Sequence, residues 1–127
     1  MSEGQKVLVV DDEPHILRSL ATYLEMENFD VTTASSGFEA LEKVDESIPD
    51  LVVLDVMMPG MDGFEVLDKI RAGAQTADIP VIMLTAKDQS EDVMTGYQKG
   101  ATSYLVKPFN LDELVDTIHQ VFAMGKK

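Results

Sequence analysis

Three short runs of aliphatic residues constrain the fold of this chain more than any other feature of its sequence. The runs are Val7 to Val10, Leu51 to Leu54 and Val81 to Leu84, and none of them alternates with polar residues. Continuous apolar runs of this length are typical of strands that are buried on both faces, as in a parallel sheet. Two weaker strand candidates are Asp30 to Ala34 and Ser103 to Val106. The sequence therefore predicts five buried or half-buried parallel strands.

Segments with helical spacing and helical start signals separate these runs. Pro14 suits the first turn of a helix, where its missing N–H is not needed. Apolar residues then recur on one helical face, and the clearest such stripe lies between Leu111 and Phe122. Four further starts carry a capping-box pattern, in which a cap residue is followed three positions later by Glu. The pairs are Ser36 with Glu39, Asp62 with Glu65, Asp88 with Glu91, and Asn110 with Glu113.

Strand and helix thus alternate five times along the chain. Right-handed crossovers then require an α/β fold with helices on both faces of the sheet. We expect a flavodoxin-like, doubly wound five-stranded parallel sheet with strand order 2-1-3-4-5 and five helices. Because no linker or internal repeat interrupts the 127 residues, residues 1–127 are predicted to be a single domain. Ligands are expected beyond the carboxyl ends of the strands, near the switch point between strands 1 and 3.

The charge balance excludes several classes of partner. With 10 Lys and Arg against 23 Asp and Glu, the formal net charge is -13. Nucleic acid and anionic membrane surfaces need a positive field, so we expect no direct binding to nucleic acid. No apolar stretch approaches the roughly 20 residues of a membrane-spanning helix, and membrane insertion is not expected. The absence of cysteine and of a signal-peptide pattern favours a cytoplasmic location.

Polar residues follow the predicted strands where the strands end. Asp11 and Asp12 follow the first run, Asp55 ends the third strand, Thr85 follows the fourth, and Lys107 follows the fifth. Clustered carboxylates repel one another unless a cation joins them, and their hard oxygen ligands suit Mg2+. A carboxylate such as Asp55 can act as a nucleophile toward phosphorus, with cations neutralising the phosphoryl oxygens. The pattern therefore predicts Mg2+-dependent phosphoryl transfer at this edge.

A simpler role remains open for some of these residues. Asp11 and Asp12 stand just before the helix predicted at Pro14, so either could serve only as a cap. Asp55 lacks that alternative, because Val56 and two methionines follow it and no helix start is near.

Four motifs in this order resemble the receiver domain of bacterial two-component response regulators, over Lys6 to about Phe122. They are VLVVDDEPH from Val7, LVVLDVMMPGMDGFE from Leu51, VIMLTAK from Val81 and GATSYLVKPF from Gly100. The resemblance implies that Asp55 is the phosphorylated aspartate. It further implies that Asp12 binds Mg2+ directly and that Asp11 acts mainly through water, with the main-chain carbonyl of Met57 as a further ligand.

The resemblance also assigns roles at the fourth and fifth strands. Thr85 resembles the switch hydroxyl, and Lys107 the lysine that contacts the phosphoryl group. The bond between Lys107 and Pro108 is expected to be cis. Tyr104 matches the aromatic switch residue, although a half-exposed strand aromatic is an equal alternative.

The resemblance implies a phosphoacceptor signalling switch that catalyses only its own phosphorylation and dephosphorylation. A sensor histidine kinase or phosphotransfer protein would supply the phosphoryl group. A downstream protein target would bind the face of the fourth helix, fifth strand and fifth helix. We expect a monomer or a weak phosphorylation-dependent dimer, with no DNA-binding output domain on this chain.

Two other functions remain open. A small Mg2+-dependent aspartyl phosphohydrolase would also use Asp55, but it typically carries a second acid two residues later, where this chain has Met57. A passive metal or FMN binder on the same fold is the other alternative, although no glycine-rich phosphate loop follows the first strand.

Overall fold

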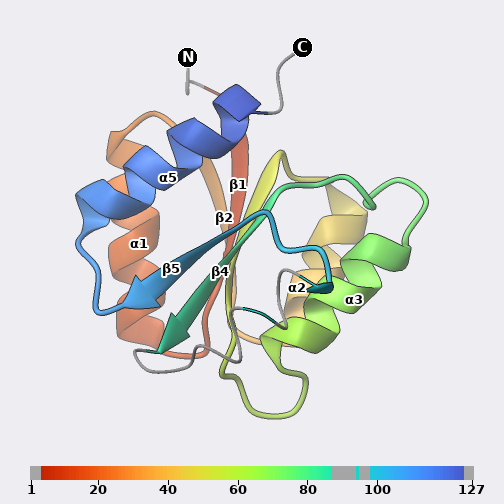
Figure 1. The fold of residues 1–127 in the computed structure, drawn as a ribbon. Helices are drawn as coiled ribbons and strands as arrows, with labels where there is room; N and C mark the ends of the chain where they lie inside the picture. Colours follow the sequence, from red (N-terminus) through yellow and green to blue (C-terminus); the bar gives the residue numbers. More distant parts are fainter. Residues whose placement is uncertain (1–3, 87–93, 95–97, 125–127) are drawn as a thin grey trace.

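Five parallel strands form one sheet in the order β2-β1-β3-β4-β5, as predicted. The protein is seen here in a computed structural model, which describes residues 4–86, 94 and 98–124. Figure 1 shows the sheet edge-on between its helices. The strands are β1 (Lys6–Val10), β2 (Asp30–Ala34), β3 (Leu51–Asp55), β4 (Val81–Ala86) and β5 (Ser103–Lys107).

Four helices lie within the described residues. They are α1 (Pro14–Met26), α2 (Gly37–Glu46), α3 (Gly63–Ala72) and α5 (Leu111–Met124). The flavodoxin-like α/β architecture is confirmed, but the predicted fifth helix is not. The helix expected to start at Asp88 falls largely outside the described residues, together with its capping pair.

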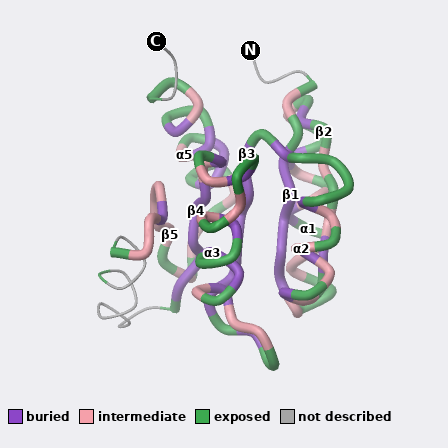
Figure 2. The backbone as a smooth tube through the Cα atoms, turned by 90° about the vertical axis from the view of Figure 1, so that its right-hand side faces the viewer, coloured by how far each residue is buried: buried purple, intermediate pink, exposed green. Residues whose placement is uncertain are grey.

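The sheet separates two hydrophobic clusters, with α1 and α5 on one face and α2 and α3 on the other (Figure 1). Successive residues of a strand point to opposite faces. Val7 and Val9 therefore pack toward α1 and α5, while Leu8 and Val10 pack toward α2 and α3. Figure 2 shows the central strands buried along their length. Burial of both faces is the physical reason why the aliphatic runs do not alternate.

Two of the predicted capping boxes form completely. Asp62 and Glu65 exchange side-chain and backbone bonds at the start of α3, and Asn110 and Glu113 do so before α5. The box predicted at Ser36 is only half correct. The Ser36 hydroxyl accepts the amide of Glu39, but the Glu39 carboxylate accepts the amide of Ser35 at 2.7 Å instead of that of Ser36.

An arginine at the end of α3 holds together the segments that enter β4 and β5. The Arg71 guanidinium donates to the carbonyl of Gly100 at 2.9 and 2.7 Å, and to those of Ile79 and Ala77 at 2.7 and 3.1 Å. Gly100 has a positive φ of 102°, a conformation that favours glycine. These bonds align the two strands whose opposite ends carry Thr85 and Lys107.

A side-chain bond between Tyr23 and Asp112 joins α1 to α5. The Tyr23 hydroxyl donates to the Asp112 carboxylate, and this bond raises the pKa of Tyr23 from 10.0 to about 12. Because the folded-state pKa is raised, the stabilisation is complete below the unfolded value and is lost as pH rises through about 12. We expect Asp112→Asn to lower the titration midpoint of Tyr23. Ultraviolet absorbance titration measures it, with Tyr23→Phe to identify the signal; an unchanged midpoint would contradict the assignment.

No helix in the part of the chain that the structure describes is long and apolar enough to cross a membrane.

Candidate functional site

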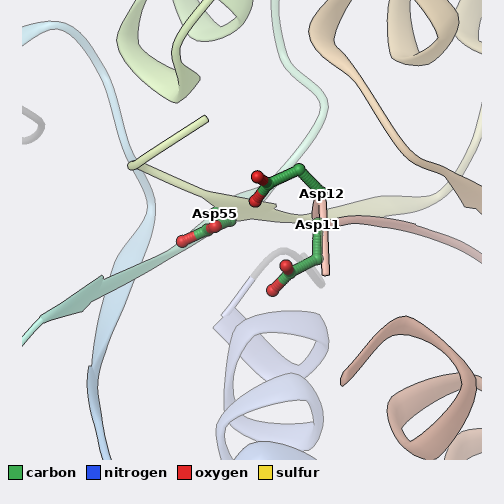
Figure 3. Close-up of side chains that lie close together, drawn as sticks. All are labelled: Asp11, Asp12 and Asp55. Atoms are coloured by element: carbon green, nitrogen blue, oxygen red, sulfur yellow. The ribbon is translucent and has the colours of Figure 1, made fainter. Parts of the chain in front are cut away.

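Three carboxylates meet at the carboxyl edge of the sheet. Asp11 and Asp12 directly follow β1, and Asp55 is the last residue of β3, the strand beside β1. One carboxylate oxygen from each residue lies within 4.8 Å of the other two. Figure 3 shows the three side chains gathered in one place. The predicted convergence of the three acids is confirmed.

Asp11 and Asp55 are nearly inaccessible to solvent, with 0% and 3% of their surface exposed, whereas Asp12 is more open. Asp11 Oδ1 accepts the amide of Glu13 at 2.9 Å. Glu13 is itself the N-cap residue of α1, and that helix has no side-chain cap. The alternative role of Asp11 as a helix cap is therefore wrong. Its Oδ1 shapes the turn before α1, and its Oδ2 is buried without a hydrogen-bond partner among the described residues.

Lys107 contributes positive charge to the site. Its Nζ lies 3.1 Å from Asp55 Oδ1 and 3.7 Å from Asp11 Oδ2. The parallel pairing of Ala86 with Lys107 and of Asp55 with Leu84 places these residues at the same end of neighbouring strands. The bond between Lys107 and Pro108 is cis, as predicted.

The pKa values of both buried carboxyl groups are raised. For Asp55 the main cause is burial, followed by the charge of Asp11, and these outweigh Lys107 and the bond from the Met57 amide. Burial is also the main cause for Asp11. The Lys107 ammonium thus does not compensate the buried negative charge of these two carboxylates. The donor set contains only oxygen, and one buried Asp11 oxygen has no hydrogen bond from the described residues. Such a set fits Mg2+, which prefers carboxylate and carbonyl ligands.

Thr85 lies at the same edge and is 1% exposed. Its hydroxyl is buried and has no hydrogen-bond partner among the described residues. Buried hydroxyl groups normally have hydrogen-bond partners. A buried hydroxyl that lacks one, at the edge of a candidate site, indicates that it hydrogen-bonds to a bound ligand. Tyr104 is half-buried in β5 and packs against the cluster under α2 and α3. This position is compatible both with an aromatic switch residue and with an ordinary half-exposed strand aromatic.

Sequence reasoning missed the contribution of Gly63, the first residue of α3. A Cβ at this position would overlap the carbonyl oxygen of Asp55 and stand 2.9 Å from the Cα of Val56. The Gly63 amide also donates to the Val56 carbonyl at 3.0 Å. The start of α3 therefore packs directly on the main chain of Asp55. The only signal in the sequence was a glycine just after the cap residue Asp62.

The family model described as the response regulator receiver domain matches residues 7–119. This chain belongs to that family. Receiver domains are phosphoacceptor switches that interact with histidine kinases or phosphotransfer proteins and with downstream targets, and they generally use Mg2+.

Receiver domains with similar sequences occur in longer proteins. The chain is 47% identical over 111 residues to the alkaline phosphatase synthesis transcriptional regulatory protein PhoP of Bacillus subtilis, covering 87% of this chain and 45% of PhoP. It is 44% identical over 111 residues to the DNA-binding response regulator MtrA of Mycolicibacterium smegmatis, covering 87% of this chain and 47% of MtrA. The chain thus spans about half the length of the curated relatives that it matches.

A solved structure of similar size is that of the chemotaxis response regulator CheY4 of Vibrio cholerae. The two chains are 38% identical with a TM-score of 0.88, and the match covers 93% of this chain and 98% of CheY4. The similarity therefore extends over nearly the whole receiver fold.

Proposed function

We propose that Asp55 accepts a phosphoryl group from a histidine kinase or phosphotransfer protein in a Mg2+-dependent reaction. One observation carries the proposal: the nearly buried Asp55 carboxylate lies 3.1 Å from the Lys107 ammonium and within 4.8 Å of the Asp11 and Asp12 carboxylates. The site thus combines a nucleophile, a cation and the oxygen ligands of a metal.

In the proposed reaction an Asp55 oxygen attacks phosphorus, and an aspartyl phosphate forms as the phosphorus–nitrogen bond of a phosphohistidine breaks. Asp11, Asp12, Asp55 and the main-chain carbonyl of Met57 would hold Mg2+. When bound, this ion neutralises negative charge on the phosphoryl oxygens. Lys107, already bonded to Asp55 Oδ1, is positioned to pair with the new negative charge beside it.

The proposed switch then runs from Thr85 to β5. The buried Thr85 hydroxyl would donate to a phosphoryl oxygen and so gain a hydrogen bond that the described residues do not provide. Thr85 pairs with Val106 and Met83 pairs with Tyr104 across β4 and β5. A displacement of Thr85 would therefore act next to Tyr104, on a face that includes β5 and α5. Binding of a downstream protein to this face would change with phosphorylation.

Phosphorylation of the wild-type chain by acetyl phosphate tests the proposal. We expect a hydroxylamine-sensitive label that needs Mg2+ and is lost in EDTA. Reduction with borohydride followed by peptide mass spectrometry should place the modification at Asp55. A label on another residue, or one formed equally in EDTA, would refute the proposal.

Mg2+ is expected to stabilise the folded chain. A ligand that binds only the folded state adds about 1.4 kcal/mol to the free energy of unfolding at ten times its dissociation constant. Asp12→Asn should remove most of this increase. Asp45→Asn, which removes one exposed charge on α2, should retain it. Urea unfolding with and without MgCl2 measures the difference, and an equal response of the two variants would contradict the metal site.

We further propose that the chain is not an enzyme toward external substrates. The position two residues after Asp55 holds Met57, whose side chain cannot act as a general acid or base. We expect no multiple turnover of p-nitrophenyl phosphate, which an aspartyl phosphohydrolase would show. The expectation that this chain carries no DNA-binding output domain remains a prediction.

A further inference from the structure

We propose that Met57 is an oxidation site through which peroxides shorten the lifetime of the phosphorylated state. The inference rests on the proposed function of Asp55. It arises from the juxtaposition of an exposed thioether and the candidate phosphoacceptor, two residues apart at the end of β3.

Met57 is accessible where its neighbours are not. Its surface is 65% exposed, whereas the next residue, Met58, is 7% exposed and belongs to the core under α2 and α3. The chain contains no cysteine, so methionine thioethers are its only sulfur groups. Oxidation of methionine follows exposure, and a neutral oxidant such as hydrogen peroxide is not repelled by the nearby carboxylates.

Another exposed methionine, Met26, lies away from the site. Met26 is 71% exposed at the carboxyl end of α1. Because α1 runs back along the sheet after β1, Met26 lies at the edge opposite to Asp55. A hydrogen bond near Met26 confirms this placement. The amide of Gly4, just before the start of β1, donates to the carbonyl of Asn28, two residues after Met26, at 3.1 Å. Met26 thus provides a thioether of matched exposure without contact with the site.

The backbone of Met57 is part of the site. Its amide donates a hydrogen bond to the Asp55 carboxylate, and this bond lowers the pKa of that group against the larger effect of burial. A change at the Met57 side chain therefore affects a residue whose amide hydrogen-bonds to the carboxylate of the proposed nucleophile, Asp55.

Hydrogen peroxide is the only co-reactant that the oxidation of Met57 needs. A lone pair of the Met57 sulfur attacks one peroxide oxygen, the oxygen–oxygen bond breaks, and water is released. Sulfur is oxidised by two electrons to the sulfoxide, and the peroxide is reduced. An exposed, apolar thioether two residues from Asp55 becomes a strong hydrogen-bond acceptor. The sulfoxide oxygen can hold water beside the aspartyl phosphate and thereby favour hydrolysis. Methionine sulfoxide reductase reverses the change.

The test compares the wild type with Met57→Leu and Met26→Leu. Each protein is divided into an untreated sample and one treated with hydrogen peroxide, and peptide mass spectrometry identifies the oxidised methionines. All samples are then phosphorylated with acetyl phosphate in Mg2+, desalted, and followed for loss of the hydroxylamine-sensitive label.

Peroxide treatment should shorten the lifetime of the label about fivefold in the wild type and in Met26→Leu. One added hydrogen bond to the attacking water would lower the barrier to hydrolysis enough to give a change of this size. Met57→Leu should keep the lifetime of its own untreated sample, and reductase treatment should restore the wild type. Unoxidised Met57 beside oxidised Met26, or equal shortening in Met57→Leu, would overturn the inference while leaving phosphorylation of Asp55 intact. Absence of label in untreated wild type would overturn both.

Discussion

Substitution of Asp55 by asparagine is expected to abolish phosphorylation from acetyl phosphate, by a factor of at least about 100, because an amide cannot replace the carboxylate nucleophile. Asp55 is the acid at this edge that Lys107 approaches most closely, at 3.1 Å against 3.7 Å for Asp11. Label incorporation in Mg2+ measures the effect. Asp45→Asn on α2 is the matched control, because it removes one charge from an exposed position and should be labelled like the wild type.

Asp55→Asn should also increase the free energy of unfolding when Mg2+ is absent. A variant that is stably folded but not labelled has lost the phosphoacceptor and not the fold. Burial and the charge of Asp11 raise the pKa of Asp55, so its ionisation disfavours the folded state. Below about pH 4 the carboxyl group is protonated in both states and the effect vanishes. The wild type should therefore lose stability relative to Asp55→Asn as pH rises toward 7. Urea unfolding midpoints of both proteins at about pH 4 and at pH 7 measure this difference in stability. Residual label on Asp55→Asn, or a variant less stable than the wild type at pH 7, would contradict the proposed site.

Replacement of Gly63 by alanine is expected to destabilise the chain by about 3 kcal/mol, the upper part of the range for overpacked positions. The added Cβ would overlap the Asp55 carbonyl oxygen and stand 2.9 Å from the Cα of Val56. Both are main-chain atoms, so neither can yield as a flexible side chain would. The start of α3 or the end of β3 must move, and phosphorylation of Asp55 should fall in the folded fraction as well.

Gly60, in the loop that precedes α3, provides the control. Its φ is +77°, but an added Cβ would meet only Phe38, at 3.8 Å. Gly60→Ala should therefore cost only the backbone strain of a left-handed residue, about 1 kcal/mol. Denaturant midpoints compare the two variants, and equal destabilisation would show that close packing on Asp55 is not what requires glycine at position 63.

The main features of the fold were predictable because burial leaves a direct record in sequence. Val7 to Val10 and Leu51 to Leu54 are apolar at every position, since helices cover both faces of the sheet. The Ser36 box was mispredicted because Ser35 and Ser36 present neighbouring amides. The Glu39 carboxylate reaches the first of them, a choice that depends on local geometry.

By itself, the sequence determined which chemical groups stand at the carboxyl ends of the strands, and hence that three acids, a hydroxyl and a lysine belong to one site. Tertiary structure alone decided how those groups interact. Packing left Asp11 Oδ2 and the Thr85 hydroxyl buried without a hydrogen bond from any described residue, and it brought Lys107 to Asp55 from 52 residues away in sequence. Such effects arise from distances and desolvation, which depend on the surroundings that remote segments create.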